Sequence, residues 1–141
     1  MTELETVKAK LLEEGATLVI QRGQSVYTSK ERGVKPLVDL IQSGEDFGGA
    51  FAADRVVGKG AAFLYVCLKV KAVYAGVISK SALKVFEDNG IFAAYGQLAD
   101  NIINRKGDGI CPFEAAVMDI EDPSIAYETL LRKMAEMNIK Y

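Results

Sequence analysis

One segment near the middle of the chain constrains the fold more than any other. Residues 72–78, Ala-Val-Tyr-Ala-Gly-Val-Ile, form an uninterrupted apolar run that is typical of a buried strand. Ser79 follows at once with a side chain suited to a helix cap, and Asn89-Gly90 supplies a helix stop. A second short strand is expected at 91–95. A strand, a helix and a strand in succession predict an α/β protein.

The rest of the chain supplies further helices and a hairpin. Thr2, with Glu5 three residues on, matches the capping-box pattern of a helix start. Segment 52–69 has a wide apolar face and predicts a long helix packed on a sheet. The expected order is a helix at 2–15, hairpin strands at 17–21 and 24–28, helices at 36–44 and 52–69, a strand at 72–78, a helix at 79–88, strands at 91–95 and near 102–103, and helices from 111 and 122. We expect one domain over residues 1–141, a layered α/β sandwich with helices flanking a mixed central sheet.

The absence of histidine limits the chemistry open to this chain. Its 141 residues include no histidine and only two cysteines, Cys67 and Cys111. This composition excludes triads with an imidazole base and zinc sites built with histidine, and two cysteines are too few for an all-cysteine zinc site. We therefore expect no metal and no other cofactor. The two cysteines lie in unrelated contexts, which favours reduced thiols in a cytoplasmic protein.

Charge and hydropathy narrow the range of partners. The 17 Lys and Arg residues nearly balance the 19 Asp and Glu residues, so no basic field indicates nucleic acid. The aromatic residues are scattered rather than interleaved with basic ones, which also disfavours a nucleic-acid surface. No run of about 18 apolar residues is present, so no membrane-spanning segment is expected. The acidic start at residues 2–5 is unlike a targeting signal.

Cys111 is the sharpest candidate for a catalytic residue. It lies at the expected start of a helix, where free backbone N–H groups and the helix dipole favour a thiolate, and Arg105 and Lys106 add positive charge upstream. One interpretation is a thiolate nucleophile; the other is a small apolar side chain, because no histidine is available to activate it. Glu114 either caps this helix or serves as an acid–base group. Asp54 either complements a helix dipole or moves a proton.

Two glycine-bearing segments indicate an anion site. Lys59 lies between two glycines but outside any Walker A pattern, so either it contacts an anion or it is solvated and the glycines serve packing. The polar loop 104–109 begins with Asn104 and Arg105 and leads into the next helix. Its backbone amides, together with Arg105, can bind phosphate or carboxylate, although an ordinary surface turn explains the same composition.

Four short motifs follow one another along the chain. They are Asp54-Arg55-Val56-Val57-Gly58-Lys59, Ile78-Ser79-Lys80, Asn104-Arg105, and Cys111-Pro112 with Glu114. In this order they resemble an uncharacterised bacterial family, a domain of unknown function with a cytidine-deaminase-like fold. The resemblance extends from the hairpin to the Cys111 helix. It implies that fold, with a pocket lined by the helix starts at Asp54 and Ser79.

The motifs that hold zinc in deaminases are altered in this chain. A zinc deaminase of this fold carries His or Cys, then Ala-Glu, at one helix start and Pro-Cys-x-x-Cys at the next. On the resemblance, Ala52 stands in place of the first ligand and Asp54 in place of the glutamate, while no cysteine lies near Ser79. The resemblance therefore implies the fold and the pocket without zinc-dependent deamination.

Three hypotheses about function follow. The first is a domain without zinc that binds a small anionic or nucleotide-like ligand at helix N-termini. The candidate ligand contacts are Lys59, Lys80, Asn104 and Arg105. The second is a metal-independent enzyme with Cys111 as nucleophile and Asp54 or Glu114 as proton carrier. The third is a structural role, with a homodimer formed through the glycine- and alanine-rich helix or through a sheet edge.

Overall fold

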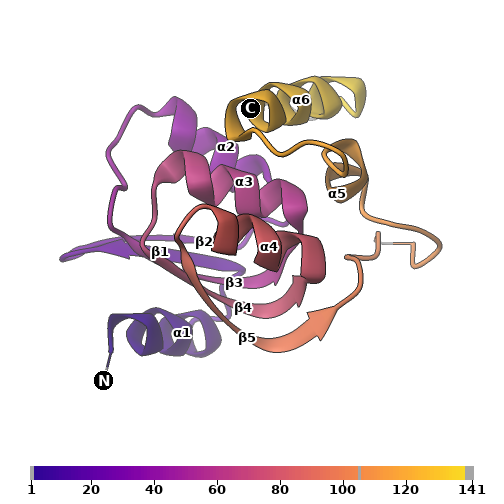
Figure 1. Ribbon diagram of the computed structural model, residues 1–141. Helices are drawn as coiled ribbons and strands as arrows, with labels where there is room; N and C mark the ends of the chain where they lie inside the picture. The colour runs from indigo at the N-terminus through magenta and orange to yellow at the C-terminus, as the bar shows by residue number, and fades with distance from the viewer. Residues whose placement is uncertain (1, 105, 139–141) are drawn as a thin grey trace.

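A computed structural model describes residues 2–104 and 106–138, and Figure 1 shows them arranged in layers. The strands are β1 (Leu18–Arg22), β2 (Ser25–Ser29), β3 (Phe51–Val57), β4 (Ala72–Ser79) and β5 (Phe92–Ala99). The helices are α1 (Glu3–Glu13), α2 (Lys35–Gln42), α3 (Lys59–Leu68), α4 (Lys80–Asp88), α5 (Pro112–Ala116) and α6 (Pro123–Glu136). One five-stranded sheet, in the order β2-β1-β3-β4-β5, forms the central layer. Helix α1 covers one face, α2, α3 and α4 cover the other, and α5 and α6 pack outside α3.

The sheet is mixed. β1 runs antiparallel to both β2 and β3, whereas β3, β4 and β5 are parallel to one another. The layered α/β sandwich with a mixed central sheet that the sequence predicts is therefore confirmed. The hairpin turns at Gly23, whose φ of 60° suits glycine, and Thr2 caps α1 by accepting the N–H of Glu5 at 3.1 Å.

The prediction of one helix over 52–69 is wrong in its first part. This part is β3, which lies between β1 and β4, and α3 begins only at Lys59. Ala52 faces the core under α3, whereas Ala53 faces the core under α1, as the alternation of a strand requires. A strand covered on both faces is nearly as apolar throughout as a buried helix, so periodicity does not separate the two.

The strand–helix–strand unit in the middle of the chain forms as predicted. β4 and β5 are parallel and joined by α4, whose cap Ser79 accepts the N–H of Ala82 through Oγ at 3.2 Å. β5 continues to Ala99, four residues past the predicted end of this strand. The strand expected near 102–103 is reduced to an isolated antiparallel bridge between Ile103 and Ile110.

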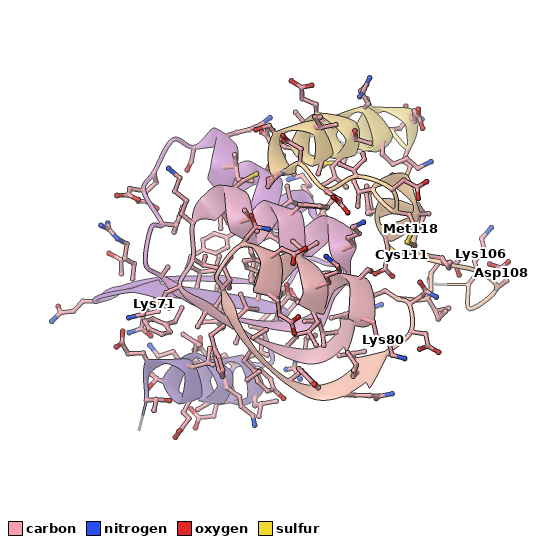
Figure 2. The ribbon with its side chains drawn as sticks, in the orientation of Figure 1. Lys71, Lys80, Lys106, Asp108, Cys111 and Met118 are labelled. Carbon is pink, nitrogen blue, oxygen red and sulfur yellow. The ribbon has the colours of Figure 1, made fainter. Side chains whose placement is uncertain are left out.

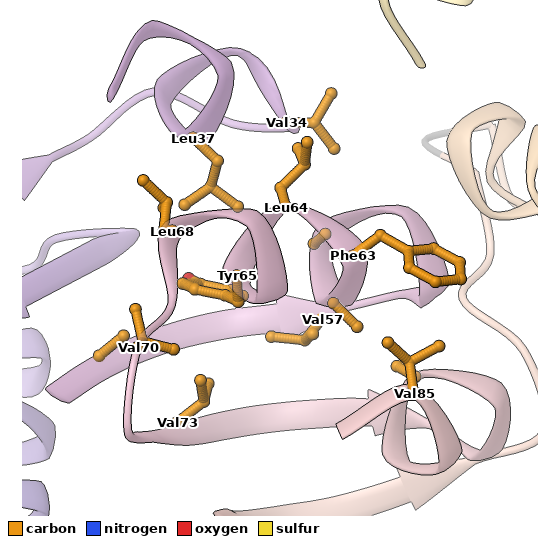
Figure 3. Packing of buried hydrophobic residues seen from close by; sticks show 14 of the residues in the cluster. Val34, Leu37, Val57, Phe63, Leu64, Tyr65, Leu68, Val70, Val73 and Val85 are labelled. Carbon is orange, nitrogen blue, oxygen red and sulfur yellow. The ribbon is translucent and has the colours of Figure 1, made fainter. Parts of the chain in front are cut away.

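Apolar side chains fill both sides of the sheet. In the larger cluster, Leu64 and Leu68 of α3 point toward α2, which contributes Leu37, and Figure 3 shows this packing. A smaller cluster, which includes Val7 and Leu11, lies under α1. Helix α3 is thus covered by the sheet, its neighbouring helices and α6. Within residues 2–104 and 106–138, no helix combines the length and the apolar character that crossing a bilayer requires.

Candidate functional site

The starts of α3 and α4 meet at the carboxylate of Glu114, which is only 1% exposed. Its Oε1 accepts the backbone N–H of Lys59 at 3.1 Å, the hydroxyl of Ser81 at 3.0 Å and the hydroxyl of Ser79. Its Oε2 accepts the backbone N–H of Ile102 at 2.5 Å. We call the carboxylate and these four donors the Glu114 cluster.

The four donors of the cluster come from three separate segments of the chain. The N–H of Lys59 is a free donor of the first turn of α3, Ser79 and Ser81 belong to the start of α4, and Ile102 follows β5. The positive ends of two helix dipoles therefore point at one negative charge. Such an arrangement binds an anion, and here the anion is a side chain of the protein itself.

The prediction that Glu114 caps its own helix is wrong. Both carboxylate oxygens bond to other segments, and the N–H of the cap residue Cys111 donates instead to the carbonyl of Ile102 at 2.8 Å. Spacing along the chain identifies local partners and carries no information about a donor far away in sequence. Ser81 and Ile102 were not predicted as site residues. The Ser79-Lys80-Ser81 pattern at a helix start, with two hydroxyl donors, was the available signal.

Lys59 contributes through its backbone while its side chain is bonded elsewhere. The residue is 8% exposed, and its Nζ donates to the carbonyl of Met118 at 2.5 Å and lies 5.8 Å from the ring centre of Phe63. This contact links the start of α3 to the segment after α5, and Figure 2 labels Met118 there. Of the two alternatives open for Lys59, the solvated side chain is wrong.

A shallow hollow adjoins the Glu114 cluster. Its volume is about 70 Å³. Lys59 and Ser81, both members of the cluster, lie on its wall with Lys84, Asn89 and Glu121. Pockets for drug-sized ligands span roughly 300–1,000 Å³, so this hollow has room for a single small group.

Asp54 does not lie at a helix start. It is in the middle of β3, so the resemblance to the Cys-Ala-Glu motif at Ala52 and Asp54 places those residues in the wrong element. Oδ2 of Asp54 accepts the hydroxyl of the fully buried Tyr65 at 2.6 Å. Burial raises the pKa of Asp54 from 3.8 to about 6, against the opposing effect of the hydrogen bonds from Tyr65 and the backbone of Val56.

The other predicted ligand contacts lie apart from the Glu114 cluster. The side chain of Lys80 is 64% exposed, and its Nζ pairs with Asp100 at 2.8 Å. Asn104 bonds to Asp108, and residues 106–109 project from the body, as the labels of Lys106 and Asp108 in Figure 2 show. Arg105, predicted as a ligand contact, lies outside the described residues.

Cys111 occupies the cap position of α5 as predicted. It is partly buried, packs against the larger core cluster, and its side chain makes no capping hydrogen bond. The two carboxylates predicted as its proton carriers bond elsewhere. Asp54 accepts the hydroxyl of Tyr65, and Glu114 accepts the donors of its own cluster. The structure thus does not join these three residues into a hydrogen-bonded set.

The Glu114 cluster does not fit a zinc ion. The groups that surround the carboxylate present N–H and O–H hydrogens, whereas zinc binds nitrogen, sulfur or oxygen lone pairs. Across the described ranges 2–104 and 106–138, no three His, Cys, Asp or Glu side chains are placed to hold a metal ion.

These features define a layered α/β sandwich in which a buried carboxylate joins the starts of two helices. The chain belongs to the TM1506 family, a domain of unknown function (DUF1893), whose family model matches residues 6–134. The crystal structure of a DUF1893 family protein, TM1506 from Thermotoga maritima, is similar over 94% of this chain and 91% of that chain. The two are 30% identical, with a TM-score of 0.86. The resemblance inferred from the motifs is confirmed.

A weaker likeness links the fold to a deaminase. The structure of a diaminohydroxyphosphoribosylaminopyrimidine deaminase/5-amino-6-(5-phosphoribosylamino)uracil reductase from Thermotoga maritima is similar over 82% of this chain, with 15% identity and a TM-score of 0.45. This chain covers only 41% of that protein, and the likeness is one of fold alone. A comparison with functionally curated proteins finds no match.

Proposed function

We propose that this protein binds a small anionic ligand at the starts of α3 and α4, in a cytoplasmic setting. The observation that carries the proposal is the Glu114 cluster, in which four donors from three segments converge on one carboxylate. In the resting state the site holds the side chain of Glu114. An external carboxylate or phosphate group takes that position when the short helix α5 shifts outward.

The chemistry of the donors supports an anion rather than another class of ligand. Backbone N–H groups at helix starts and serine hydroxyls bind carboxylate and phosphate oxygens through charge-assisted hydrogen bonds. Both helices exceed eight residues, with 10 in α3 and 9 in α4, so each contributes a substantial dipole. No step of a reaction is needed to account for these contacts. Asp54 and Glu114, the proton carriers expected for Cys111, are hydrogen-bonded to other groups, which favours binding over catalysis.

The size of the adjoining hollow limits the ligand. About 70 Å³ accommodates one phosphate or carboxylate group and leaves any larger part of a ligand on the surface. We therefore propose a small carboxylate or phosphate as the recognised group, with Lys84 and Asn89 on the wall of the hollow as its nearest additional polar contacts. A nucleotide would place only its phosphate here.

The proposal is tested by thermal unfolding of the wild-type protein with inorganic phosphate, acetate, ribose 5-phosphate and a nucleoside monophosphate. A ligand at about 100 times its dissociation constant stabilises a protein by about 2.7 kcal/mol, which is an easily measured rise in Tm. The same series is applied to Glu114→Ala, in which the site is vacated, and to Glu114→Gln in case the first variant does not fold. Glu128→Ala, on the exposed side of α6, is the matched control.

The expected result is stabilisation of the wild type by at least one of these anions and a larger stabilisation of Glu114→Ala. Sodium chloride at the same ionic strength should have no such effect. If acetate or phosphate stabilises only the Glu114 variant and no anion affects the wild type, Glu114 is a permanent structural group and the proposed function is refuted. The same conclusion follows if no anion stabilises either protein.

A further inference from the structure

The ammonium group of Lys59 is a buried positive charge with a neutral partner. Lys59 is 8% exposed, and its Nζ donates to the carbonyl oxygen of Met118 at 2.5 Å. Among the described residues, no carboxylate forms an ion pair with it. Buried charges in proteins are normally paired with an opposite charge, because a neutral acceptor compensates less of the desolvation cost. The ammonium of Lys59 can therefore pair with an anion that enters from outside.

This ammonium lies where such an anion would enter. Lys59 shares the wall of the hollow beside the Glu114 cluster with three other charged residues, Lys84, Asp88 and Glu121. Lys84 and Asp88 pair with each other at 2.6 Å. The hydrogen bond from Asp88, with a smaller effect of Glu121, raises the pKa of Lys84, so both carboxylates act on that lysine. Lys59 is thus the cation on the described wall that lacks an ion-pair partner.

Residues 111–121 close the Glu114 cluster, and we call this segment the strap. It contains α5 and the turn that follows. Its Glu114 carboxylate accepts the backbone N–H of Lys59, and its Met118 carbonyl accepts the ammonium of the same residue. Glu121 at its end contributes to the wall of the hollow. The strap is therefore tied to α3 by two polar contacts with a single residue.

We propose that Lys59 couples anion binding to a shift of the strap, which rests on the proposed function. Without a ligand, Nζ donates to Met118 and holds the strap over the Glu114 cluster. A carboxylate or phosphate in the hollow is a stronger acceptor than a carbonyl because it is charged, so Nζ exchanges Met118 for the anion. The strap then shifts, and Glu114 leaves the two helix starts to the anion.

The internal bonding of the strap allows it to shift as a unit. The N–H of Ala115 donates to the carbonyl of Cys111 at 3.0 Å, and the N–H of Ile120 donates to the carbonyl of Val117 at 3.0 Å. These bonds lie within the strap, so a shift does not break them. The buried side chains of Phe113 and Val117 belong to the larger core cluster and keep the strap on the protein.

Alkylation of Cys111 in a Cys67→Ala chain tests the proposal, because this thiol begins the strap and packs against the core. Without an anion, Lys59→Met should accelerate alkylation by about tenfold, since the bond from a charged donor to Met118 is lost. Lys71→Met makes the same chemical change on the opposite side of the molecule in Figure 2 and should leave the rate unchanged. An anion that stabilises the parent chain in thermal unfolding should accelerate alkylation there, and by a smaller factor in Lys59→Met.

Hydrogen exchange of the wild-type protein provides a second measurement if Lys59→Met does not fold. The N–H of Ile102 is bonded to Glu114, whereas Leu130 lies in the middle of α6 and is fully buried. A shift of the strap frees the first N–H and leaves α6 folded, so Ile102 should exchange faster than Leu130.

Equal alkylation rates in Lys59→Met and Lys71→Met would overturn the proposal, as would exchange of Ile102 no faster than that of Leu130. An anion that stabilises the protein and accelerates alkylation by the same factor with and without the Lys59 ammonium would overturn it as well, but would leave the proposed function standing. If no anion stabilises the protein, the thermal series alone refutes the proposed function, and the role of Lys59 in anion binding fails with it.

Discussion

Replacing Glu114 by glutamine changes one atom in the buried cluster and should have a large effect on stability. The amide oxygen of Glu114→Gln can serve the donors on only one side of the group. If it faces Lys59 N, Ser79 and Ser81, the new NH₂ meets the backbone N–H of Ile102, so two donors oppose each other where a 2.5 Å bond existed. The variant is therefore nearly isosteric but has the wrong hydrogen-bond pattern.

The size of the effect follows from these contacts. A lost hydrogen bond to a charged group costs roughly 1.5–3 kcal/mol, and the three remaining bonds weaken by about half when the acceptor becomes neutral. Removing a buried charge recovers part of this loss, since its desolvation cost disappears. We expect a net decrease of about 3 kcal/mol in the free energy of unfolding. For a chain of this length that corresponds to a fall in Tm of roughly 10 °C.

Urea unfolding followed by circular dichroism, together with calorimetry, measures the difference. Glu128→Gln makes the same substitution at an exposed position of α6 and should change stability by less than about 0.5 kcal/mol. Ser81→Ala should cost less in the Glu114→Gln background than in the wild type, because the two residues share a bond. A change in Glu114→Gln no larger than the control would refute the view that the cluster is a charged, fully bonded network.

Three further predictions concern other parts of the molecule. The pKa of Asp54 in the folded state is raised from 3.8 to about 6, so the native state keeps a proton that the unfolded chain loses, and the free energy of unfolding should fall by roughly 3 kcal/mol as pH rises from about 4 to 7. Asp54→Asn should flatten this pH profile in urea titrations, and an unchanged slope would contradict the raised pKa of Asp54. At Gly76 a Cβ would lie 2.7 Å from a backbone oxygen of β3, so Gly76→Ala should cost about 1–3 kcal/mol in calorimetry, while Gly109→Ala, with its nearest neighbour at 3.6 Å, should have little effect. Burial, with a smaller contribution from the neighbouring Asp122, raises the pKa of the Cys67 thiol. In a Cys111→Ala chain, alkylation of Cys67 near neutral pH should therefore be much slower than that of free cysteine and should accelerate with pH. Fast labelling would show that the thiol is accessible and ionised.

The candidate site was only partly predictable. The sequence identified the start of α4 at Ser79 and singled out Glu114 and Lys59, and these three residues do meet. It offered the cap of its own helix or acid–base chemistry for Glu114, and an anion contact or a solvated side chain for Lys59. These alternatives were all drawn from neighbours along the chain. The actual partners of Glu114 lie up to 55 residues away, and no local spacing reports them.

Local physical chemistry accounts for what the sequence determined by itself. Caps at Thr2, Ser79 and Asp122, and the apolar run of β4, depend on residues within a few positions of one another, so these elements and the α/β class were predictable. Only the tertiary structure decided that residues 51–57 form a strand, because burial on both faces removes the alternation that would reveal it. It alone decided that a carboxylate from α5 joins the starts of α3 and α4, since that contact exists only once the sheet has aligned both helices on one face.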